Sequence, residues 1–166
     1  LREKLRGTGV RCYITGGNDD TPEVLAVLEE LAGDDTVVPC EDRVVYLGDR
    51  YPMVSSGLSN PTPWRTPREI PDDDFREELT RLADEVRDPR RTILLTHCPP
   101  HDTGLDTAPL LDEQMRPIVS AGDLLRGPVG STGVRRAIEE LRPLLGIHGH
   151  IHESGGEVRL GPTLCL

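Results

Sequence analysis

The 166-residue chain lacks any apolar run long enough to cross a membrane. A spanning helix needs roughly 20 consecutive apolar residues, and no segment of this sequence approaches that length. The first residues, LREKLRG, also lack the basic start and apolar block of a secretory leader. We therefore expect a protein with no membrane partner.

Lysine is nearly absent, because Lys4 is the only one in the chain. The 29 acidic residues outnumber the 19 basic ones and give a formal net charge of −10. Coating nucleic acid requires clustered Lys and Arg that neutralise phosphates, so a nucleic-acid partner is disfavoured. The acidic surface would repel a small anionic substrate at long range unless a metal ion reversed the charge locally.

No pair of cysteines has CxxC spacing, and the four match neither a zinc ribbon nor a disulfide scaffold: Cys12, Cys40, Cys98 and Cys165. We expect free, mostly buried thiols of a reducing compartment, which predicts a cytoplasmic protein. Cys98 directly follows His97 and could be a ligand or nucleophile. The favoured interpretation is a small core residue beside a functional neighbour.

The sequence has no internal repeat or low-complexity segment, and its length suits one domain spanning residues 1–166. It begins with Leu and finishes on the apolar stretch GPTLCL. We therefore expect a domain that is incomplete at its N-terminus and at its C-terminus.

Hydrophobic patterning predicts alternating strands and helices. Short apolar or β-rich runs predict strands at residues 10–15, 36–39, 43–48, 53–57, 91–97, 144–147, 157–160 and 163–166. Periodic apolar stripes predict helices at residues 21–33, 72–86 and 131–143. The three strands between residues 36 and 57 are expected to be antiparallel neighbours, because short polar turns separate them. This order indicates a layered α/β domain with mixed sheets.

The first predicted helix carries signals at both ends. Thr21 is the expected N-cap, Pro22 the first helical residue and Gly33 the stop. Its apolar stripe, expected to face the core, consists of Val24, Val27, Leu28 and Leu31.

Two segments have no predicted element. Residues 57–73 contain four prolines and no periodicity, which indicates a surface loop long enough to be functional. Residues 98–130 likewise show no clear helix or strand pattern.

Polar side chains follow three of the predicted strands. The first strand is followed by Asn18, Asp19 and Asp20, the strand at 91–97 ends in His97, and the strand at 144–147 runs into His148, His150 and His152. In open α/β sheets, ligands bind outside the carboxyl ends of the strands. If these strands are parallel neighbours, the three clusters meet at one site.

The run GIHGHIHESGG suggests a metal site. In an extended backbone, residues i and i+2 point to the same side about 6.6 Å apart, so His150 and His152 are expected to face one cavity. Neutral imidazole is the commonest metal ligand, although exposed or hydrogen-bonded loop histidines are the simpler alternative. Nitrogen and oxygen donors suit Mn, Fe, Zn, Ni or Co, and Asn18 favours a catalytic site over a closed structural zinc site.

The segments GGNDD, LLTHCPP and GHIHE, in that order, resemble the last three of the five motifs of the calcineurin-like metallophosphoesterases. The resemblance implies a layered α/β/β/α sandwich with two divalent metal ions in a cleft at the strand ends. It also implies that the second metal is bound by Asn18, His97 and His150, and the first by His152.

The resemblance suggests roles for the remaining polar residues as well. Asp19 stands where many members have a histidine that aids the leaving group, and an aspartate is a weaker acid catalyst near neutral pH. His101 is a candidate for substrate binding, Asp20 is expected to orient a neighbour, and His148 to pack or hydrogen-bond beside the ligands.

The family's first two motifs, an Asp-x-His and a Gly-Asp, have no counterpart before residue 10. The segment Gly48–Arg50 has the letters of the second motif but follows the third, so we interpret it as a strand end or turn. The missing motifs would supply two ligands of the first metal, the bridging carboxylate and the N-terminal strands. We therefore expect at most one bound metal, poor activity of this chain alone, and an open sheet edge that invites self-association.

Three functions compete. The leading hypothesis is metal-dependent hydrolysis of small phosphate mono- or diesters by a dinuclear site completed outside this chain. The alternative is a non-catalytic module that binds one metal or regulates. A metal-dependent amidohydrolase also uses His-x-His, but this pair follows nearly the last strand and the chain is too short for the required barrel.

Overall fold

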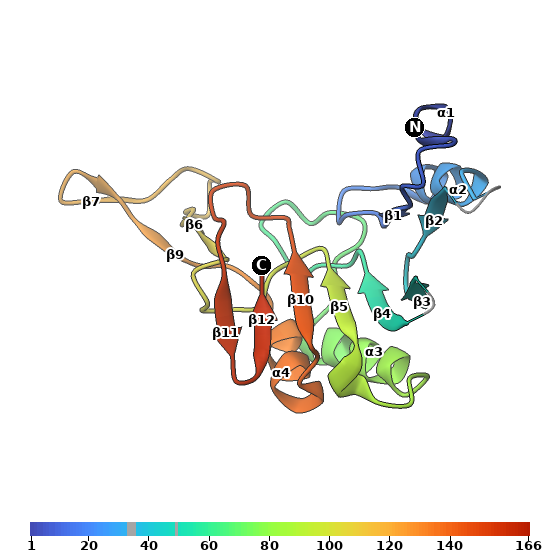
Figure 1. Ribbon diagram of the computed structural model, residues 1–166. Coiled ribbons are helices and arrows are strands. Elements are labelled where there is room, and N and C mark those ends of the chain that lie inside the picture. Colours follow the sequence, from blue (N-terminus) through green and yellow to red (C-terminus); the bar gives the residue numbers. More distant parts are fainter. Residues whose placement is uncertain (33–35, 49) are drawn as a thin grey trace.

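The computed structural model describes residues 1–32, 36–48 and 50–166 (Figure 1). Its main element is a six-stranded mixed sheet with the strand order β11-β12-β10-β5-β4-β3. The strands are β3 (Arg43–Leu47), β4 (Tyr51–Ser56), β5 (Ile93–Thr96), β10 (Leu145–His148), β11 (Val158–Leu160) and β12 (Thr163–Cys165). The four central strands are parallel, and β3 and β11 join them antiparallel at the edges. The mixed α/β class predicted from the sequence is confirmed.

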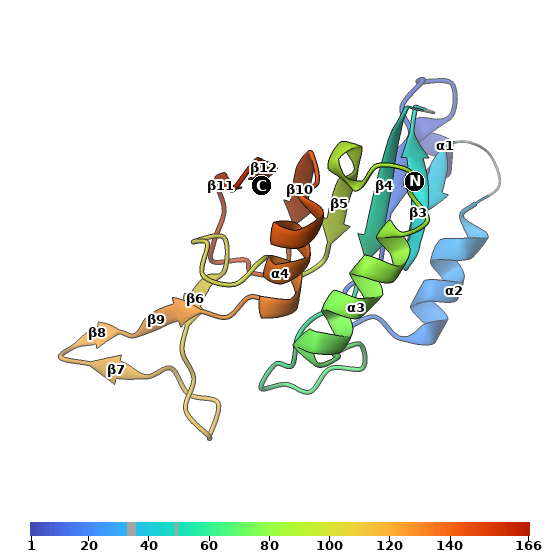
Figure 2. The same ribbon diagram turned by 90° about the horizontal axis from the view of Figure 1, so that it is seen from below.

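Two helices cover one face of this sheet. α3 (Asp72–Ala83) and α4 (Thr132–Leu141) lie side by side across it (Figure 2). Phe75 and Leu79 of α3 and Ile138 of α4 are fully buried against Val54 and Leu94 of the sheet. Ser131 caps α4 by accepting a hydrogen bond from the backbone N–H of Val134. The helices therefore bury their apolar stripes as predicted.

The opposite face of the sheet carries a smaller cluster with a two-stranded sheet beside it. Met53 and Ile93 are buried there with Cys40, and Tyr13 packs against them. β1 (Cys12–Ile14) pairs in parallel with β2 (Val37–Pro39), and α2 (Pro22–Glu30) connects them. The prediction that residues 36–39 pair antiparallel with the next strand is wrong, because β2 belongs to this βαβ unit. Only β3 and β4 form the expected antiparallel pair.

α2 begins as predicted, with Thr21 as N-cap and Pro22 as first residue. The predicted stop, Gly33, lies outside the described residues. None of the nine residues of α2 is buried, and the side chains of Val24 and Val27 are 39% and 55% exposed. The prediction of a core-facing stripe is therefore wrong. A helix buries its stripe only under a covering layer, and two short strands cannot cover this one.

Residues 107–128 form a two-stranded arm that extends away from the sheet (Figures 1 and 2). In the arm, β6 (Thr107–Pro109) pairs with β9 (Arg126–Pro128), and β7 (Val119–Ser120) pairs with β8 (Asp123–Leu124). No element was expected in this segment. The strands are very short and mostly exposed, so they do not show the alternation that marks a half-buried strand.

Three further expectations concern single features. All four cysteines are free, and Cys40, Cys98 and Cys165 are buried, as predicted. Gly48 follows β3 in a turn with a φ of +54°, whereas Asp49 lies outside the described residues. No helix in the described ranges is both long and apolar enough to cross a bilayer. A short helix, α1 (Arg2–Leu5), and a 3-10 turn, η1 (Pro89–Arg91), complete the elements.

Candidate metal centre

The ends of β5 and β10 meet at one edge of the sheet. These strands are parallel neighbours, with His148 opposite Thr96, so the residues that follow them leave the sheet side by side. The backbone N–H of Gly149 donates a 2.9 Å hydrogen bond to the carbonyl oxygen of His97. The loop after β1 reaches the same edge, and a cavity of about 730 Å³ opens there. Five of the six predicted site residues line this cavity: Asn18, Asp19, His97, His150 and His152.

Three donor atoms form the centre of this group. Nε2 of His97 lies 2.9 Å from Oδ1 of Asn18 and 3.1 Å from Nδ1 of His150. Metal–nitrogen bonds are about 2.1 Å long, so two ligand atoms at right angles around one cation lie about 3.0 Å apart. Each of these two distances is therefore that of neighbouring ligands of a single cation.

Both imidazoles are held in the neutral form that binds metals. Burial lowers the pKa of His97 to about 4, and the neighbouring His150 contributes to the shift. Burial also lowers the pKa of His150. A metal displaces protons from its ligands, so a site whose histidines are already neutral near pH 7 pays no deprotonation cost.

A hydrogen-bond relay fixes the orientation of the Asn18 amide. The Thr66 hydroxyl donates to a carboxylate oxygen of Glu69 at 2.6 Å, so its oxygen is free to accept from Nδ2 of Asn18 at 2.9 Å. The amide nitrogen of Asn18 is thereby directed away from the histidines and its oxygen towards His97. Oxygen is the atom of a carboxamide that coordinates cations, so the relay presents the ligand atom to the site.

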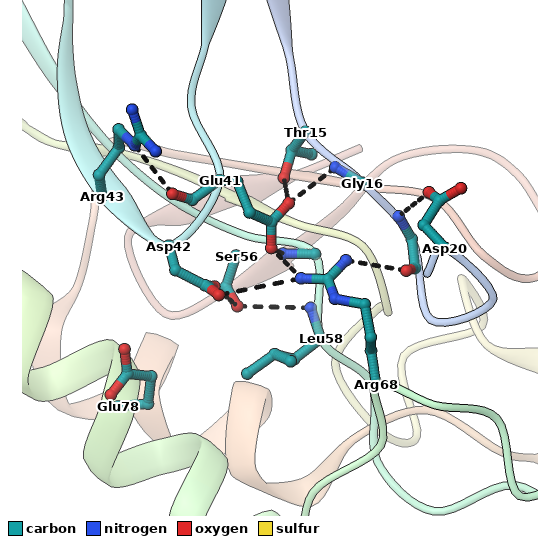
Figure 3. Close-up of polar contacts among 12 residues, drawn as sticks. Thr15, Gly16, Asp20, Glu41, Asp42, Arg43, Ser56, Leu58, Arg68 and Glu78 are labelled. Carbon is teal, nitrogen blue, oxygen red and sulfur yellow. Dashed lines mark hydrogen bonds and ion pairs between the residues drawn. The ribbon is translucent and has the colours of Figure 1, made fainter. Parts of the chain in front are cut away.

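A buried ion pair holds the loop that carries Asn18 (Figure 3). The guanidinium of Arg68 pairs with the carboxylate of Glu41, and the two side chains are only 9% and 10% exposed. Glu41 also accepts hydrogen bonds from the Thr15 hydroxyl at 2.6 Å and from the Gly16 N–H at 2.7 Å. These bonds attach the end of β1 to the turn that follows β2.

Arg68 also holds the loop that carries Asn18 through two hydrogen bonds to its backbone. Its Nη1 donates to the carbonyl oxygen of Gly17 at 2.9 Å, and its backbone N–H donates to the carbonyl oxygen of Asn18 at 3.2 Å. Arg68 and Glu41 are charged and nearly buried, so each depends on the other for compensation. Together they fix the position of Asn18 relative to the main sheet.

Asp42 lies beside this pair. Burial raises the pKa of the Asp42 carboxyl, which also lies close to Glu41, while the Ser56 hydroxyl donates to it at 2.7 Å. For Glu41, burial acts to raise the pKa, but hydrogen bonds from Thr15 and Gly16 and the charge of Arg68 outweigh it and lower the pKa. Glu41 is therefore the partner that keeps its negative charge against Arg68.

The backbone at His150 is not extended, so the expected alternation of His150 and His152 on one strand is wrong. β10 ends at His148, and His150 adopts a φ of +69° at the centre of a three-residue γ-turn, in which the Ile151 N–H donates to the carbonyl oxygen of Gly149 at 2.8 Å. Such a conformation is strained for a residue with a side chain and is typically retained at functional sites. The turn directs His150 towards His97, and His152 lines the cavity as an exposed residue.

His148 packs beside the ligands, as expected. The Thr96 hydroxyl donates to the carbonyl oxygen of Cys98 at 2.8 Å, so Nδ1 of His148 donates to the Thr96 oxygen at 2.8 Å. Nε2 of His148 is buried and has no partner among the described residues. A Cβ at position 146 would lie 2.6 Å from this nitrogen, so Gly146 provides the space for the ring.

Other predicted residues lie around or outside the cavity. Asp20 accepts a 2.7 Å hydrogen bond from the N–H of Gly17, which is the orienting role expected of it. His101 is not among the cavity residues, and its Nδ1 lies 3.3 Å from the carbonyl oxygen of Gly130. Cys98 is fully buried in the core, and burial raises its thiol pKa to about 12. This supports its interpretation as a small core residue.

The donor set within the described part of the chain is partial. No three His, Cys, Asp or Glu side chains in the described residues are placed to hold a metal ion together. The cluster instead consists of two imidazoles and one carboxamide. Divalent metals of this type take four or more ligands, so further donors would have to complete the sphere.

The supporting residues were missed by sequence reasoning. Glu41 and Arg68 lie in irregular segments, where neither has a periodic pattern. The Pro-rich loop that contains Thr66 and Glu69 was identified as functional by its length alone. An arginine in a loop of many polar residues gives no sign that it will be buried.

Comparison with known proteins supports the fold without naming a family. No protein-family model matches the chain. An uncharacterized protein of Methanocaldococcus jannaschii, MJ1162, is 29% identical over 152 residues, which cover 90% of this chain and 60% of that protein. The crystal structure of TT1561 of Thermus thermophilus matches with a TM-score of 0.58 and 18% identity, covering 92% of this chain and 60% of that one.

A further crystal structure matches more closely, with a TM-score of 0.68 at 19% identity, covering 95% of this chain and 57% of its own. At such identities the likeness shows a shared fold alone. The chain spans about 60% of the length of the relatives it matches.

Proposed function

We propose that this chain forms the greater part of a metal-dependent phosphoesterase that hydrolyses small phosphate mono- or diesters. The single observation that carries the proposal is the convergence of Asn18, His97 and His150 with the spacing of cation ligands. The order of the motifs and the layered fold agree with a calcineurin-like metallophosphoesterase, and we propose that family for the chain.

In this proposal, Oδ1 of Asn18 and the ring nitrogens of His97 and His150 hold one divalent cation. When bound, such a cation polarises a phosphoryl group and activates water near neutral pH. His152, exposed at the cavity, is proposed to serve a second cation whose remaining ligands lie outside this chain. The metal would be Mn, Fe, Zn, Ni or Co, and the partner a small phosphoester.

Asp19 is proposed to face the leaving group. It is exposed, lines the cavity and directly follows the ligand Asn18. The neighbouring Asp20 adds a second carboxyl group to the cavity wall. Without a cation, two acidic side chains would repel a phosphate group, so substrate binding should depend on the metal. The role of His101 in substrate binding stays a prediction.

Metal binding by the purified chain tests this proposal. We expect equilibrium dialysis against Zn²⁺ or Mn²⁺ to give one bound ion per chain, and His150→Ala to abolish binding. Glu157→Ala, at an exposed position outside the cavity, is the control and should bind as the parent does.

Turnover separates the enzyme from a binding module. Hydrolysis of p-nitrophenyl phosphate or bis-p-nitrophenyl phosphate that requires metal and is lost in His150→Ala would support the enzyme. One bound metal with no hydrolysis in the full-length protein would support the non-catalytic module. A full-length protein that binds no metal would contradict both.

A further inference from the structure

Trp64 is an exposed aromatic residue at the edge of the metal cavity. It is the single tryptophan of the chain, its side chain is 63% exposed, and it lines the same cavity as Asn18, His97 and His150. Tryptophan is usually well buried, because its large ring contributes much hydrophobic free energy when removed from water. The flat apolar ring of Trp64 is thus exposed in the cavity that the candidate metal ligands line.

The backbone that carries Trp64 is held by one carboxylate. Glu69 accepts hydrogen bonds from the Thr62 N–H at 2.9 Å and from the Thr66 N–H at 2.8 Å, on either side of Trp64. The Trp64 N–H donates to the Thr62 hydroxyl at 3.2 Å. For Glu69, burial acts to raise the pKa, but the bonds from Thr62 and Thr66 outweigh it and lower the pKa. The loop is therefore ordered before any ligand arrives.

The same loop is bonded to the candidate metal ligands. Thr66, two residues after Trp64, accepts the hydrogen bond of the Asn18 amide. Arg68 donates to the carbonyl oxygens of Gly17 and Asn18. These contacts fix the position of the Trp64 backbone relative to the metal cluster.

The cavity is larger than a phosphate group requires. Its volume of about 730 Å³ lies within the range of roughly 300–1,000 Å³ for sites that enclose small organic ligands. Its wall contains two parts of different chemistry, the polar donors and Trp64. A ligand with a phosphate at one end and a flat ring at the other matches both parts, because aromatic rings stack on tryptophan.

We propose that Trp64 is a substrate-stacking residue and that the phosphoesters bound here carry a planar aromatic group, either a nucleobase or a simple aryl ring. This inference rests on the proposed function, because it assumes that the phosphate lies at the Asn18–His97–His150 cluster. Trp64 acts on binding and on specificity, and stacking on it favours aromatic esters over aliphatic ones.

Fluorescence offers a direct test, since Trp64 is the source of all tryptophan emission. The chain is titrated with AMP, phenyl phosphate and ribose 5-phosphate, each with and without Zn²⁺. We expect AMP or phenyl phosphate to quench the emission and ribose 5-phosphate to leave it unchanged. Stronger binding of AMP would identify nucleosides as the source of the ring, and equal binding would identify aryl groups in general.

Calorimetry on variants completes the test. We expect Trp64→Leu to weaken AMP binding roughly tenfold and to leave ribose 5-phosphate binding unchanged, whereas Trp64→Phe keeps most of the affinity. The exposed Trp64 side chain makes these substitutions compatible with folding, which circular dichroism checks. Equal affinity of the parent for AMP and ribose 5-phosphate, or no binding of either, would overturn the proposal.

The two proposals fail in different ways. If Zn²⁺ does not bind but AMP still quenches Trp64, the metal proposal fails and stacking stands. If Zn²⁺ binds and Trp64→Leu leaves AMP affinity unchanged, stacking alone fails. Protection of Trp64 from acrylamide quenching in the free protein would also overturn the stacking proposal, because the ring would then be covered.

Discussion

The side-chain oxygen of Asn18 lies 2.9 Å from Nε2 of His97, although 79 residues separate them in the chain. The loop after β1 and the end of β5 provide these atoms, and His150 joins them from the end of β10. Three segments that lie far apart in the sequence thus form one cluster at one edge of the sheet.

Thr66 should control metal affinity through the Asn18 amide. Thr66→Val removes the oxygen that accepts from Nδ2 of Asn18, so the amide loses its fixed orientation. Residues that orient a ligand typically contribute 10- to 100-fold in affinity, and we expect about a tenfold loss for Zn²⁺ by isothermal titration calorimetry. Thr66→Ser keeps the hydroxyl and should bind as the parent does. Equal affinities of the Val and Ser variants would show that the relay is dispensable.

The Arg68–Glu41 pair should dominate the stability of the loop after β1. Arg68→Met leaves the nearly buried Glu41 without its partner, and loss of one member of such a pair costs about 3–5 kcal/mol in the free energy of unfolding. Urea denaturation measures this change. The matched control is Arg43→Met, which breaks an ion pair with Glu29 whose side chains are both 45% exposed. We expect Arg43→Met to lower the free energy of unfolding by at most about 1 kcal/mol. Equal losses in the two variants would show that the Arg68–Glu41 pair does not dominate the stability of the loop.

The histidine pKa values predict a loss of stability in acid. Burial lowers the pKa of His97 and of His148 to about 4, whereas an unfolded histidine titrates near 6.5. As pH falls, the unfolded chain binds these protons first, so the free energy of unfolding of the metal-free protein decreases between about pH 6.5 and pH 4. Above that window these groups contribute no pH dependence.

Replacement of one histidine isolates its part of this effect. His148→Gln cannot titrate in this window, so its free energy of unfolding should change less steeply with pH than that of the parent. Denaturation curves at several pH values compare the two slopes, whatever the absolute stability of the variant. A variant slope as steep as that of the parent would argue against a buried neutral His148.

Cys98 should be chemically inert in the folded protein, although it is next to a candidate ligand. It is fully buried, and burial raises its pKa to about 12, so little thiolate forms near pH 8. Native iodoacetamide treatment followed by peptide mass spectrometry should modify the half-buried Cys12 and spare Cys98. Both should react in denaturant. Rapid native labelling of Cys98 would revive its interpretation as a nucleophile.

From the sequence, the residues of the cluster were easier to predict than their geometry. His97 and His150 were recognisable because each follows an apolar strand, and parallel strands bring their carboxyl ends together. The turn at His150 was not predictable from neighbouring residues, since its positive φ accompanies a hydrogen bond from Gly149 to the distant His97. Asn18 was found by its motif, but not Thr66, which orients it.

Burial was the other quantity that local patterns could not supply. α2 has the same kind of apolar stripe as α3, yet Val27 is 55% exposed and Phe75 is fully buried. The difference depends on which layer lies over each helix, and this is a property of the whole chain. The same holds for Arg68, whose burial depends on Glu41 arriving from another loop.

The long sequence separations in the cluster determine when it can form during folding. His97 must meet Asn18 across 79 residues and His150 across 53, and closing such loops costs entropy before any contact is gained. A cation therefore has no assembled site on the unfolded chain and would bind only after the strands have docked. Its expected kinetic effect is slower unfolding, with little acceleration of refolding.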